Sequence, residues 1–527
     1  MKKIGGLIAI IISFLIVYFV DPFSFNISNE GLWILCIFCL GVGGVTELIL
    51  NSELSKALKY FWGAGILFGL FFIIEILSSP LINSKSYYNL IGDVKKVKLS
   101  DEQSITDMNK IIIVDEEMSF NLARKKIGEI SALGSVSELN ISTLQQINGD
   151  LYWILPLEHK NIFTAYKNEG SAGYIKVSAT KLNDVELVQQ LNGENIKLTQ
   201  QFTSKLFDNI YRKTKLKYKN KIIQNNEVFE IDDNGNPYWI FHTVEKSINL
   251  FGGEKLEGLI VVNAITGKSD YYDIDNVPNW IENVYTGELI YKYISYWGKY
   301  VNGFINFSHT DQLETTPNIS LVNGVDGGTY WLTGMTSVGK DDATVGFIMV
   351  NSKTFEAKMY NCSGATEEAA MLSAEGEVQE KEYDAGYPIV YNILDTPTYV
   401  IPLKDSAGLI KNIAMMPIND YSTVTVASNL KDTYNKYKIE LKKNKTATIG
   451  NNGDLKNMVG SVEKAVPIVK DGNTYLYLKL TGYNDKIELS PELYQTVPFI
   501  EEGLNVTVKY YDYYDNNIVI DSIIINN

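Results

Sequence analysis

Acid–base catalysis and metal binding near neutral pH most often use histidine, and this chain has three: His159, His242 and His309. No second histidine lies near any of them, and the carboxylate of Glu158 beside His159 is an arrangement common by chance. The sequence has no H-E-x-x-H zinc motif, no G-x-S-x-G nucleophile elbow and no P-loop. We therefore expect structural or surface histidines, with no catalytic residue, metal or cofactor.

Residues 232–236, Asp-Asp-Asn-Gly-Asn, offer the oxygen ligands that calcium prefers. They lack the glutamate that closes a twelve-residue EF-hand loop, and they separate two runs of strand-forming residues. A β-turn is therefore expected. Residues 323–328 also lie between strand signals, so their glycines favour a hairpin over a phosphate cradle.

Cysteine use and net charge exclude further classes of function. Cys36 and Cys39 lie one helical turn apart in an apolar run and Cys362 stands alone, so these residues form neither a disulfide framework nor a thiolate metal site. The 62 Asp and Glu residues outnumber the 47 Lys and Arg residues, which gives a net charge of −15. Because nucleic-acid binding depends on clustered basic residues, no nucleic-acid partner is expected.

Three apolar runs near the N-terminus cover residues 4–20, 31–50 and 60–77. Each is close to the roughly 20 residues that cross a bilayer as a helix. They predict a membrane anchor over residues 1–80 with three transmembrane helices, and hence the lipid bilayer as a partner.

The short flanks of these runs predict their orientation, because cytoplasmic flanks are enriched in Lys and Arg. Lys2 and Lys3 precede the first run and Lys56 and Lys59 precede the third, whereas residues 21–30 carry neither residue type. The N-terminus is therefore expected in the cytoplasm and the chain from about residue 80 onward outside it. The residues expected at the membrane interface are Lys2, Lys3, Lys56, Lys59, Tyr60 and Trp62.

Beyond the anchor, residues 236–280 contain three short runs of β-branched and aromatic residues separated by Gly, Asn and Asp, which predict an antiparallel meander. A strand that carries an aromatic pair, followed across a loop by a second strand, recurs along the chain. A weaker fourth copy covers residues 399–416. Recurrence within one chain favours core packing over ligand contact. The repeat-core candidates are Tyr152, Trp153, Tyr238, Trp239, Gly258, Tyr330, Trp331 and Gly346.

Apolar residues at helical spacing predict helices between these strands. The ranges are 119–133 with Ser119 as N-cap, 202–212, 281–300, 366–380 with Ser363 or Thr366 as N-cap, and 429–443 as a charged linker helix. The basic run at residues 213–221 is interpreted as a solvated face, since its surroundings are acidic. The 34 tyrosines are expected mainly at half-buried strand positions, although surface tyrosines can also bind partners.

The last part of the chain, residues 446–527, contains about five short alternating strands with turn signals between them. This pattern predicts a small β-barrel, and the strand order resembles that of an OB-type barrel. Such barrels often bind oligonucleotides through basic and aromatic surfaces. Acidic residues outnumber lysines here, so a nucleic-acid function is not expected.

The run Gly258-Leu-Ile-Val-Val followed by Asn263-Ala-Ile-Thr-Gly267 resembles the second half of a PepSY-type module, in which a helix precedes a hairpin. The resemblance covers residues 205–280, and the other copies share only the pattern of strands. It implies a non-catalytic, extracytoplasmic binding or inhibitory domain of the kind found in envelope membrane proteins of Gram-positive bacteria. It supplies no catalytic residues.

The predicted fold class is α+β multidomain: three N-terminal transmembrane helices, tandem PepSY-like α+β modules and a C-terminal OB-like β-barrel. The expected boundaries are 1–80 for the anchor, 85–190, 191–310 and 311–428 (possibly double) for three modules, 429–445 for a linker helix and 446–527 for the barrel. The leading hypothesis is a non-enzymatic cell-envelope scaffold with an envelope protein partner. The alternatives are an accessory subunit of a membrane-embedded secretion, conjugation or phage-related machine, and a cell-wall or peptide hydrolase.

Overall fold

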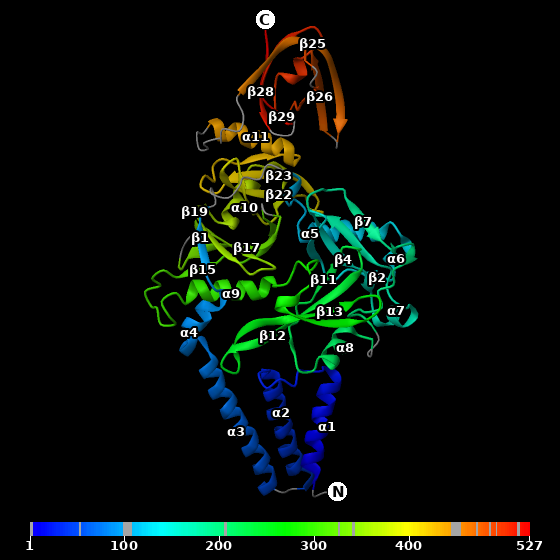
Figure 1. Ribbon diagram of the computed structural model, residues 1–527, viewed down its shortest axis with the longest axis vertical. Helices are drawn as coiled ribbons and strands as arrows, with labels where there is room; N and C mark the ends of the chain where they lie inside the picture. Colours follow the sequence, from blue (N-terminus) through cyan, green and yellow to red (C-terminus); the bar gives the residue numbers. More distant parts are fainter. Residues whose placement is uncertain are drawn as a thin grey trace. The chain divides into compact units, whose positions relative to one another are not determined.

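The computed structural model is a mixed α+β protein with apolar N-terminal helices and several small sheets (Figure 1). It describes residues 4–51, 54–98, 108–204, 208–324, 327–339, 343–443, 455–470, 473–483, 486–491, 493–513 and 517–526. The chain forms two compact units. Unit 1 comprises residues 1–97 and 114–361, and unit 2 comprises residues 98–113 and 362–527. Of the residues that the sequence analysis placed in the first module, the described residues 98 and 108–113 belong to unit 2.

The N-terminal helices are α1 (Gly5–Val20), α2 (Glu30–Thr46), which continues as the π-helical segment Glu47–Asn51, and α3 (Leu54–Ser78). By length and composition, Glu30–Leu50 and Leu54–Ser78 could each cross a membrane. α1 is apolar but has only 16 residues, about 24 Å of helix, against a hydrocarbon core of about 30 Å. Of the three expected spans, two therefore meet the length criterion, and the first remains a prediction.

Glycines bring the three helices together at the end that includes the start of α1 (Figure 1). A Cβ atom on Gly43 would lie 2.8 Å from Ile10, and one on Gly44 would lie 2.8 Å from Phe61. Nearby, the buried Glu47 carboxylate accepts a hydrogen bond from the Gly6 N–H at 2.8 Å. This bond satisfies one of the N–H groups that the first turn of a helix leaves without a partner.

Four antiparallel sheets follow, each preceded by a helix, and we call these units repeats 1 to 4. Repeat 1 consists of α5 (Glu116–Gly128), β3 (Thr143–Ile147), β4 (Asp150–Pro156), β6 (Tyr174–Ser178) and β7 (Val185–Val188). Repeat 2 consists of α8 (Ile210–Lys217), β10 (Ile222–Ile223), β11 (Val228–Ile231), β12 (Pro237–Ile248), β13 (Gly252–Asn263) and β14 (Ser269–Asp273).

Repeat 3 consists of α9 (Gly287–Lys299), β15 (Leu313–Thr315), β16 (Ser320–Asn323), β17 (Thr329–Ser337), β18 (Ala343–Asn351) and β19 (Ala357–Ala365). Strand β1 (Val94–Val97) extends its sheet by pairing parallel to β19. Repeat 4 lies in unit 2 and consists of α10 (Glu367–Gly376), β20 (Asp384–Ala385), β21 (Ile389–Ile393), β22 (Thr396–Lys404), β23 (Ile410–Pro417) and β24 (Thr425–Ala427).

Within unit 1, the helices pack between sheets and so join one repeat to the next. Leu289, Ile290 and Ile294 of α9 form one buried cluster with side chains from the sheets of repeats 2 and 3 (Figure 1). A second cluster joins Ile210 of α8 to buried side chains of the sheets of repeats 1 and 2. Because α8 and α9 each pack against the sheets of two repeats, repeats 1, 2 and 3 share hydrophobic cores.

The C-terminal part of unit 2 contains α11 (Leu430–Lys443), β25 (Leu455–Lys470), β26 (Asn473–Leu480), β27 (Lys486–Leu489), β28 (Asn505–Tyr513) and β29 (Asn517–Ile525). Their order in the sheet is β27-β26-β25-β28-β29. In the described part of this region the outermost strands β27 and β29 do not pair, so no closed barrel is seen. β25 pairs with β28 through residues 455–461 and with β26 through residues 462–470.

Local hydrogen bonding places several helix boundaries differently from the sequence analysis. Asp115, not Ser119, caps α5, because its carboxylate accepts from the Met118 N–H at 2.9 Å. α8 begins after Asn209, which accepts from the Arg212 N–H at 2.9 Å. Thr366 caps α10, as one of the two expected N-caps.

α11 is more than a linker, since it packs on repeat 4 and buries Tyr437 and Leu441. The shorter elements are α4 (Pro80–Tyr88), α6 (Ser131–Gly134), α7 (Ile162–Lys167), β2 (Ser137–Glu138), β5 (Glu158–His159), β8 (Gln190–Leu191), β9 (Glu194–Asn195), and 3₁₀ turns at Asn89–Ile91, Met108–Lys110, Ile274–Asn276, Gln379–Lys381 and Val497–Phe499.

Candidate functional site

The recurring aromatic residues occupy one equivalent position in the four sheets. Each donates a hydrogen bond from its ring N–H or hydroxyl to the carbonyl of a residue that precedes the helix of its repeat. The pairs are Trp153 with Val114 at 2.8 Å, Trp239 with Gln200 at 2.9 Å, Trp331 with Tyr285 at 2.8 Å and Tyr399 with Ala365 at 2.9 Å. We call this interaction the aromatic staple, because it fastens the helix entry to the centre of the sheet.

The stapled residue is held from a second side as well. Its own N–H donates to the carbonyl of a residue just after the strand that follows the aromatic strand, which is β6, β13, β18 or β23. These bonds join Val114 to Ala179, Gln200 to Ala264, Tyr285 to Ser352 and Ala365 to Ile418, at 2.8 to 3.1 Å. The polar atoms of the aromatic rings are therefore used within the fold, which assigns Trp153, Trp239 and Trp331 a structural role.

The other repeat-core candidates also occupy equivalent positions. Tyr152, Tyr238 and Tyr330 precede the stapled tryptophans in their strands and face Ser178, Asn263 and Asn351 of the next strand. Glycine is required at Gly258 and Gly346 by close approach of the neighbouring strand. A Cβ atom there would lie 2.3 Å from the Tyr272 carbonyl and 2.2 Å from the Tyr360 carbonyl, respectively.

The three histidines are separate from one another. His159 is buried in β5, and burial lowers its pKa, whereas His309 lies in a turn with its Nδ1 2.7 Å from Gln312. His242 is buried in β12, with Nε2 2.9 Å from the Asn283 carbonyl, and burial lowers its pKa to about 4. Among the described residues, no group of three or more His, Cys, Asp or Glu side chains could hold a metal.

Beside His242, the buried carboxylate of Glu230 accepts three hydrogen bonds from the segment that leads into α9. The donors are the Glu282 N–H, the Asn283 N–H and the Asn283 side chain, at 2.8 to 2.9 Å. Burial, partly offset by these donors, raises the Glu230 pKa to about 7. This arrangement positions the segment before α9, in the way that Glu158 accepts from the Phe202 and Thr203 N–H groups before α8.

The aspartate-rich turn at residues 232–236 is the expected β-turn. The Gly235 N–H donates to the Asp232 carbonyl at 2.8 Å. The Asp232 carboxylate accepts from the N–H groups of Asn234 and Asn236 at 2.9 and 2.8 Å. Its oxygens are thus used to close the turn between β11 and β12.

The ends of the three apolar helices that lie nearest the sheets are all fastened to repeat 2. At the end of α1, the Arg212 guanidinium donates to the Phe19 carbonyl, and Lys215 pairs with Asp21 at 2.9 Å. At the start of α2, Lys246 of β12 pairs with Glu30 at 3.0 Å. The segment between α1 and α2 is also held, because the Phe25 N–H donates to the Lys219 carbonyl at 2.7 Å.

The tip of the β12–β13 hairpin secures the end of α3. Asn249 donates to the Leu77 carbonyl at 2.6 Å, and the Phe251 N–H donates to the Ser78 hydroxyl at 3.3 Å. The buried ring of Phe251 lies between helices α2 and α3. Its centroid is 5.7 Å from that of Trp33 and 5.3 Å from that of Phe71.

We expect Lys246→Met to lower the stability of this attachment by about 1 kcal/mol, since the substitution leaves Glu30 and Glu254 close together without their shared cation. The Lys246 side chain is only 9% exposed, but Glu30 is much more exposed, which limits the loss. The measurement is the thermal midpoint of the full chain in mild detergent. Lys255→Met, on the same strand pair at an exposed position, is the matched control, and an equal shift in both variants would contradict the assignment.

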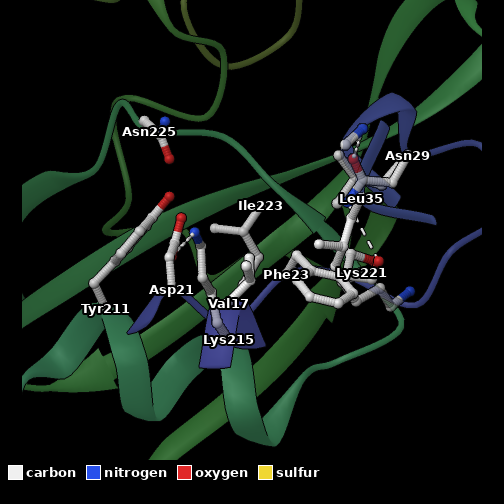
Figure 2. Close-up of a pocket in the computed structure, with 13 residues that line it drawn as sticks. Val17, Asp21, Phe23, Asn29, Leu35, Tyr211, Lys215, Lys221, Ile223 and Asn225 are labelled. Carbon is white, nitrogen blue, oxygen red and sulfur yellow. Dashed lines mark hydrogen bonds and ion pairs between the residues drawn. The ribbon is translucent and has the colours of Figure 1, made fainter. Parts of the chain in front are cut away.

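A cavity of about 350 Å³ lies where α1, the segment after it, the start of α2, α8 and β10 meet. Figure 2 shows the side chains that line it. Its apolar wall includes Val17, Phe23 and Leu35, and its charged side chains are Asp21, Lys215 and Lys221. An apolar wall below a small set of polar groups is the chemistry of a site for an amphiphilic ligand.

Tyr211, Asp21 and Lys215 lie together on one side of this cavity (Figure 2). Burial raises the Tyr211 pKa, and Lys215 Nζ lies 4.1 Å from the centroid of its ring. Lys221 contacts Glu257 and lies 4.1 Å from the ring centroid of Tyr271. A second, more open groove of about 590 Å³ runs beside β7 and includes Ser171, Val188 and Lys197.

The cavity contains none of the site residues expected from the sequence. Lys2 and Lys3 lie outside the described residues. Lys56, Lys59, Tyr60 and Trp62 lie in the first turns of α3, at the opposite end of the apolar helices, where Trp62 is 71% exposed. The sequence feature that could have indicated this cavity is the basic run at residues 213–221. Its interpretation as a solvated face is wrong for Lys215, which is only 15% exposed and paired with Asp21.

No protein-family model matches this chain, and a search of curated proteins found no match.

Proposed function

We propose that this protein is a non-enzymatic, membrane-anchored scaffold of the cell envelope, with its repeats and C-terminal sheet on the extracytoplasmic side. The observation that carries the proposal is the attachment of all three apolar helices to repeat 2 by separate contacts. A flexible tether needs only one covalent connection. Several polar and aromatic contacts instead fix the base of a folded region against its anchor, which suits a surface presented at a set height and angle.

The surface of the anchor supports insertion in lipid. Long apolar side chains along α1 and α3 are exposed, whereas such residues in a water-soluble unit are normally covered. The exposed set includes Ile8, Ile12, Leu15, Phe19, Ile66, Phe68, Phe72 and Ile73. Lys56 and Lys59 in the first turns of α3, together with the absence of Lys and Arg from residues 21–30, support a cytoplasmic N-terminus.

Two likenesses of fold support the proposed domain types. Repeat 2 has the order of helix and antiparallel strands that the PepSY-like resemblance implies. The order β27-β26-β25-β28-β29 is compatible with an open OB-like sheet. In both cases we propose the family-like role of a binding or regulatory surface for other envelope proteins.

The topology is tested by protease treatment of intact protoplasts of the host. We expect digestion of the chain beyond residue 80 without lysis, because the proposal places it outside the membrane. An epitope at the C-terminus should disappear, while a cytoplasmic marker protein survives. Protection of the C-terminal epitope until the membrane is permeabilised would contradict the proposed orientation.

An exposed apolar loop favours a second candidate function, that of an accessory subunit in a larger membrane assembly. Phe304, Ile305 and Phe307 are exposed in residues 301–308, and Phe307 is 92% exposed. Clustered exposed apolar side chains are typical of contact surfaces. Purification in mild detergent with and without Phe307→Ser tests this function. Loss of a stoichiometric partner in the variant would support it, and an unaccompanied protein in both would oppose it.

A further inference from the structure

We propose that the cavity between α1, α2 and repeat 2 binds the phosphate-bearing headgroup of an anionic glycerophospholipid. The inference rests on the proposed membrane anchoring, because that anchoring puts the cavity at the height of lipid headgroups. The cavity lies near the ends of the apolar helices. Val17 lies three residues before the end of α1, and Leu35 lies five residues after the start of α2. At 1.5 Å per residue, this places the apolar wall about 5–8 Å inside the helix ends.

The cavity lining combines apolar and cationic side chains. The larger apolar side chains Val17, Phe23 and Leu35 come from the anchor side, which also contributes Asp21, Ser24 and Asn29. Both lysines, Lys215 and Lys221, come from repeat 2, which also contributes Ile222 and Ile223. A glycerophospholipid has the same division, with its phosphate above its acyl chains. A volume of about 350 Å³ is at the small end for ligand sites. It suits a headgroup whose acyl chains leave along the apolar helices.

The stretch of chain beside the cavity is locally basic. Although the chain has a net charge of −15, residues 209–226 contain no Asp or Glu. The basic residues in that stretch are Arg212, Lys213, Lys215, Lys217, Lys219 and Lys221. This basic stretch lies against the end of α1. Clustered basic side chains at a membrane surface attract anionic lipid headgroups by Coulomb attraction, which acts over about a Debye length in either leaflet.

The ion-pair partner of Lys215 within the protein is an exposed carboxylate. Asp21 pairs with Lys215 at 2.9 Å, but the Asp21 side chain is 69% exposed and can be hydrated without leaving its place in the chain. A lipid phosphate can therefore replace the carboxylate on Lys215, whereas a cationic choline group would meet two lysines. The cavity lining carries two lysines and one aspartate, and Lys221 also pairs with Glu257, which lies outside the lining. The exposed Asp21 is thus the carboxylate that a phosphate would replace inside the cavity.

The test is retention of phosphatidylglycerol, relative to phosphatidylcholine, by the full chain in mixed-lipid nanodiscs, measured by native mass spectrometry after transfer to detergent. We expect Lys215→Gln/Lys221→Gln to reduce retention of phosphatidylglycerol about tenfold, the equivalent of one charge-assisted hydrogen bond. Asp21→Asn should increase retention, because it removes the competing carboxylate. The control is Lys213→Gln/Lys217→Gln, which makes the same charge change on α8 outside the cavity lining.

The outcomes separate this inference from the proposed anchoring. Release of the wild-type protein from membranes by alkaline carbonate would contradict the anchoring itself. Stable insertion with equal phosphatidylglycerol retention in the cavity and control variants would overturn only the headgroup site. Competition by glycerol 1-phosphate at the same concentration as the lipid would also overturn it, by assigning the cavity to a soluble anion. An unchanged chymotryptic digestion pattern, which does not depend on the substituted lysines, verifies folding, and the gain expected for Asp21→Asn cannot arise from misfolding.

Discussion

Replacement of Trp239 by alanine is expected to lower the free energy of unfolding of unit 1 by about 3–5 kcal/mol, the range typical of deleting a large buried aromatic side chain. Trp239 is completely buried, with its ring centroid 4.8 Å from that of Phe202 and 4.9 Å from that of Phe229. The same substitution also removes the donor of the aromatic staple to Gln200. The core shared by repeats 1 and 2 therefore loses both packing and the connection to the segment before α8.

The measurement is native-state proteolysis of the full chain in mild detergent across a urea series, with fragments mapped to repeats. Trp239→Phe isolates the staple, since it keeps most of the packing and leaves the Gln200 carbonyl without this donor. It should cost about 1–3 kcal/mol. Trp62→Ala, at an exposed position in α3, is the control for loss of a tryptophan. If Trp239→Phe behaved as wild type, the staple would be a consequence of packing and not a cause of stability.

The repeat pattern could be predicted from sequence because aromatic residues and glycine mark backbone positions with few alternatives. Trp239 and Trp331 are large apolar residues with one donor, and that donor needs a fixed partner when the ring is buried. Gly258 and Gly346 are required by carbonyls of the next strand, as the short Cβ distances show. These constraints arise within one repeat, so a short stretch of sequence contains them.

The helix boundaries were less predictable because they depend on which residue the staple fixes. In repeats 1, 3 and 4 the residue after the stapled one is the N-cap: Asp115, Thr286 and Thr366. In repeat 2 the stapled Gln200 is separated from the N-cap Asn209 by an inserted segment. Apolar spacing from residue 202 onward therefore suggests a helix several residues too early.

The cavity could not be predicted because its two sides are almost 200 residues apart. Asp21 belongs to the segment after the first apolar run, and Lys215 belongs to α8 of repeat 2. Charge counted along the chain shows an acidic protein with a basic run, but not that the run meets the end of α1. The attachment of α3 by the hairpin tip at Asn249 and Phe251 was unpredictable for the same reason.

Substitution of Glu230 or His242 is expected to reveal two opposite pH dependences of stability that nearly cancel in the wild type. Burial raises the Glu230 pKa from 4.5 to about 7, so the folded state holds a proton that the unfolded state has lost between these values. The Glu230 contribution is therefore greatest below pH 4.5 and falls as pH rises through 7. At 1.36 kcal/mol per pKa unit, the loss is about 3 kcal/mol.

His242 acts in the other direction, because burial lowers its pKa from 6.5 to about 4. Between these values the unfolded state takes up a proton that the folded state does not, so stability is greatest above pH 6.5 and falls by about 3 kcal/mol as pH decreases through 4. The two residues bind the same segment before α9, through Asn283. As pH rises from 4 to 7, the free energy of unfolding contributed by His242 therefore increases by nearly as much as that contributed by Glu230 decreases.

The single variants separate these contributions when the unfolding free energy of each is compared with wild type at several pH values. The unfolding free energy of Glu230→Gln, relative to wild type, should increase by about 3 kcal/mol as pH rises from 4.5 to 7. That of His242→Gln should increase by about the same amount as pH falls from 6.5 to 4. Glu245→Gln, at an exposed position in β12, controls for the loss of one carboxylate. Because the two expected slopes have opposite signs, a general effect of pH on the protein cannot produce both. Parallel profiles for both variants and wild type would show that neither side chain titrates differently in the folded state, and Glu230 and Asn283 would then form an ordinary hydrogen-bonded contact.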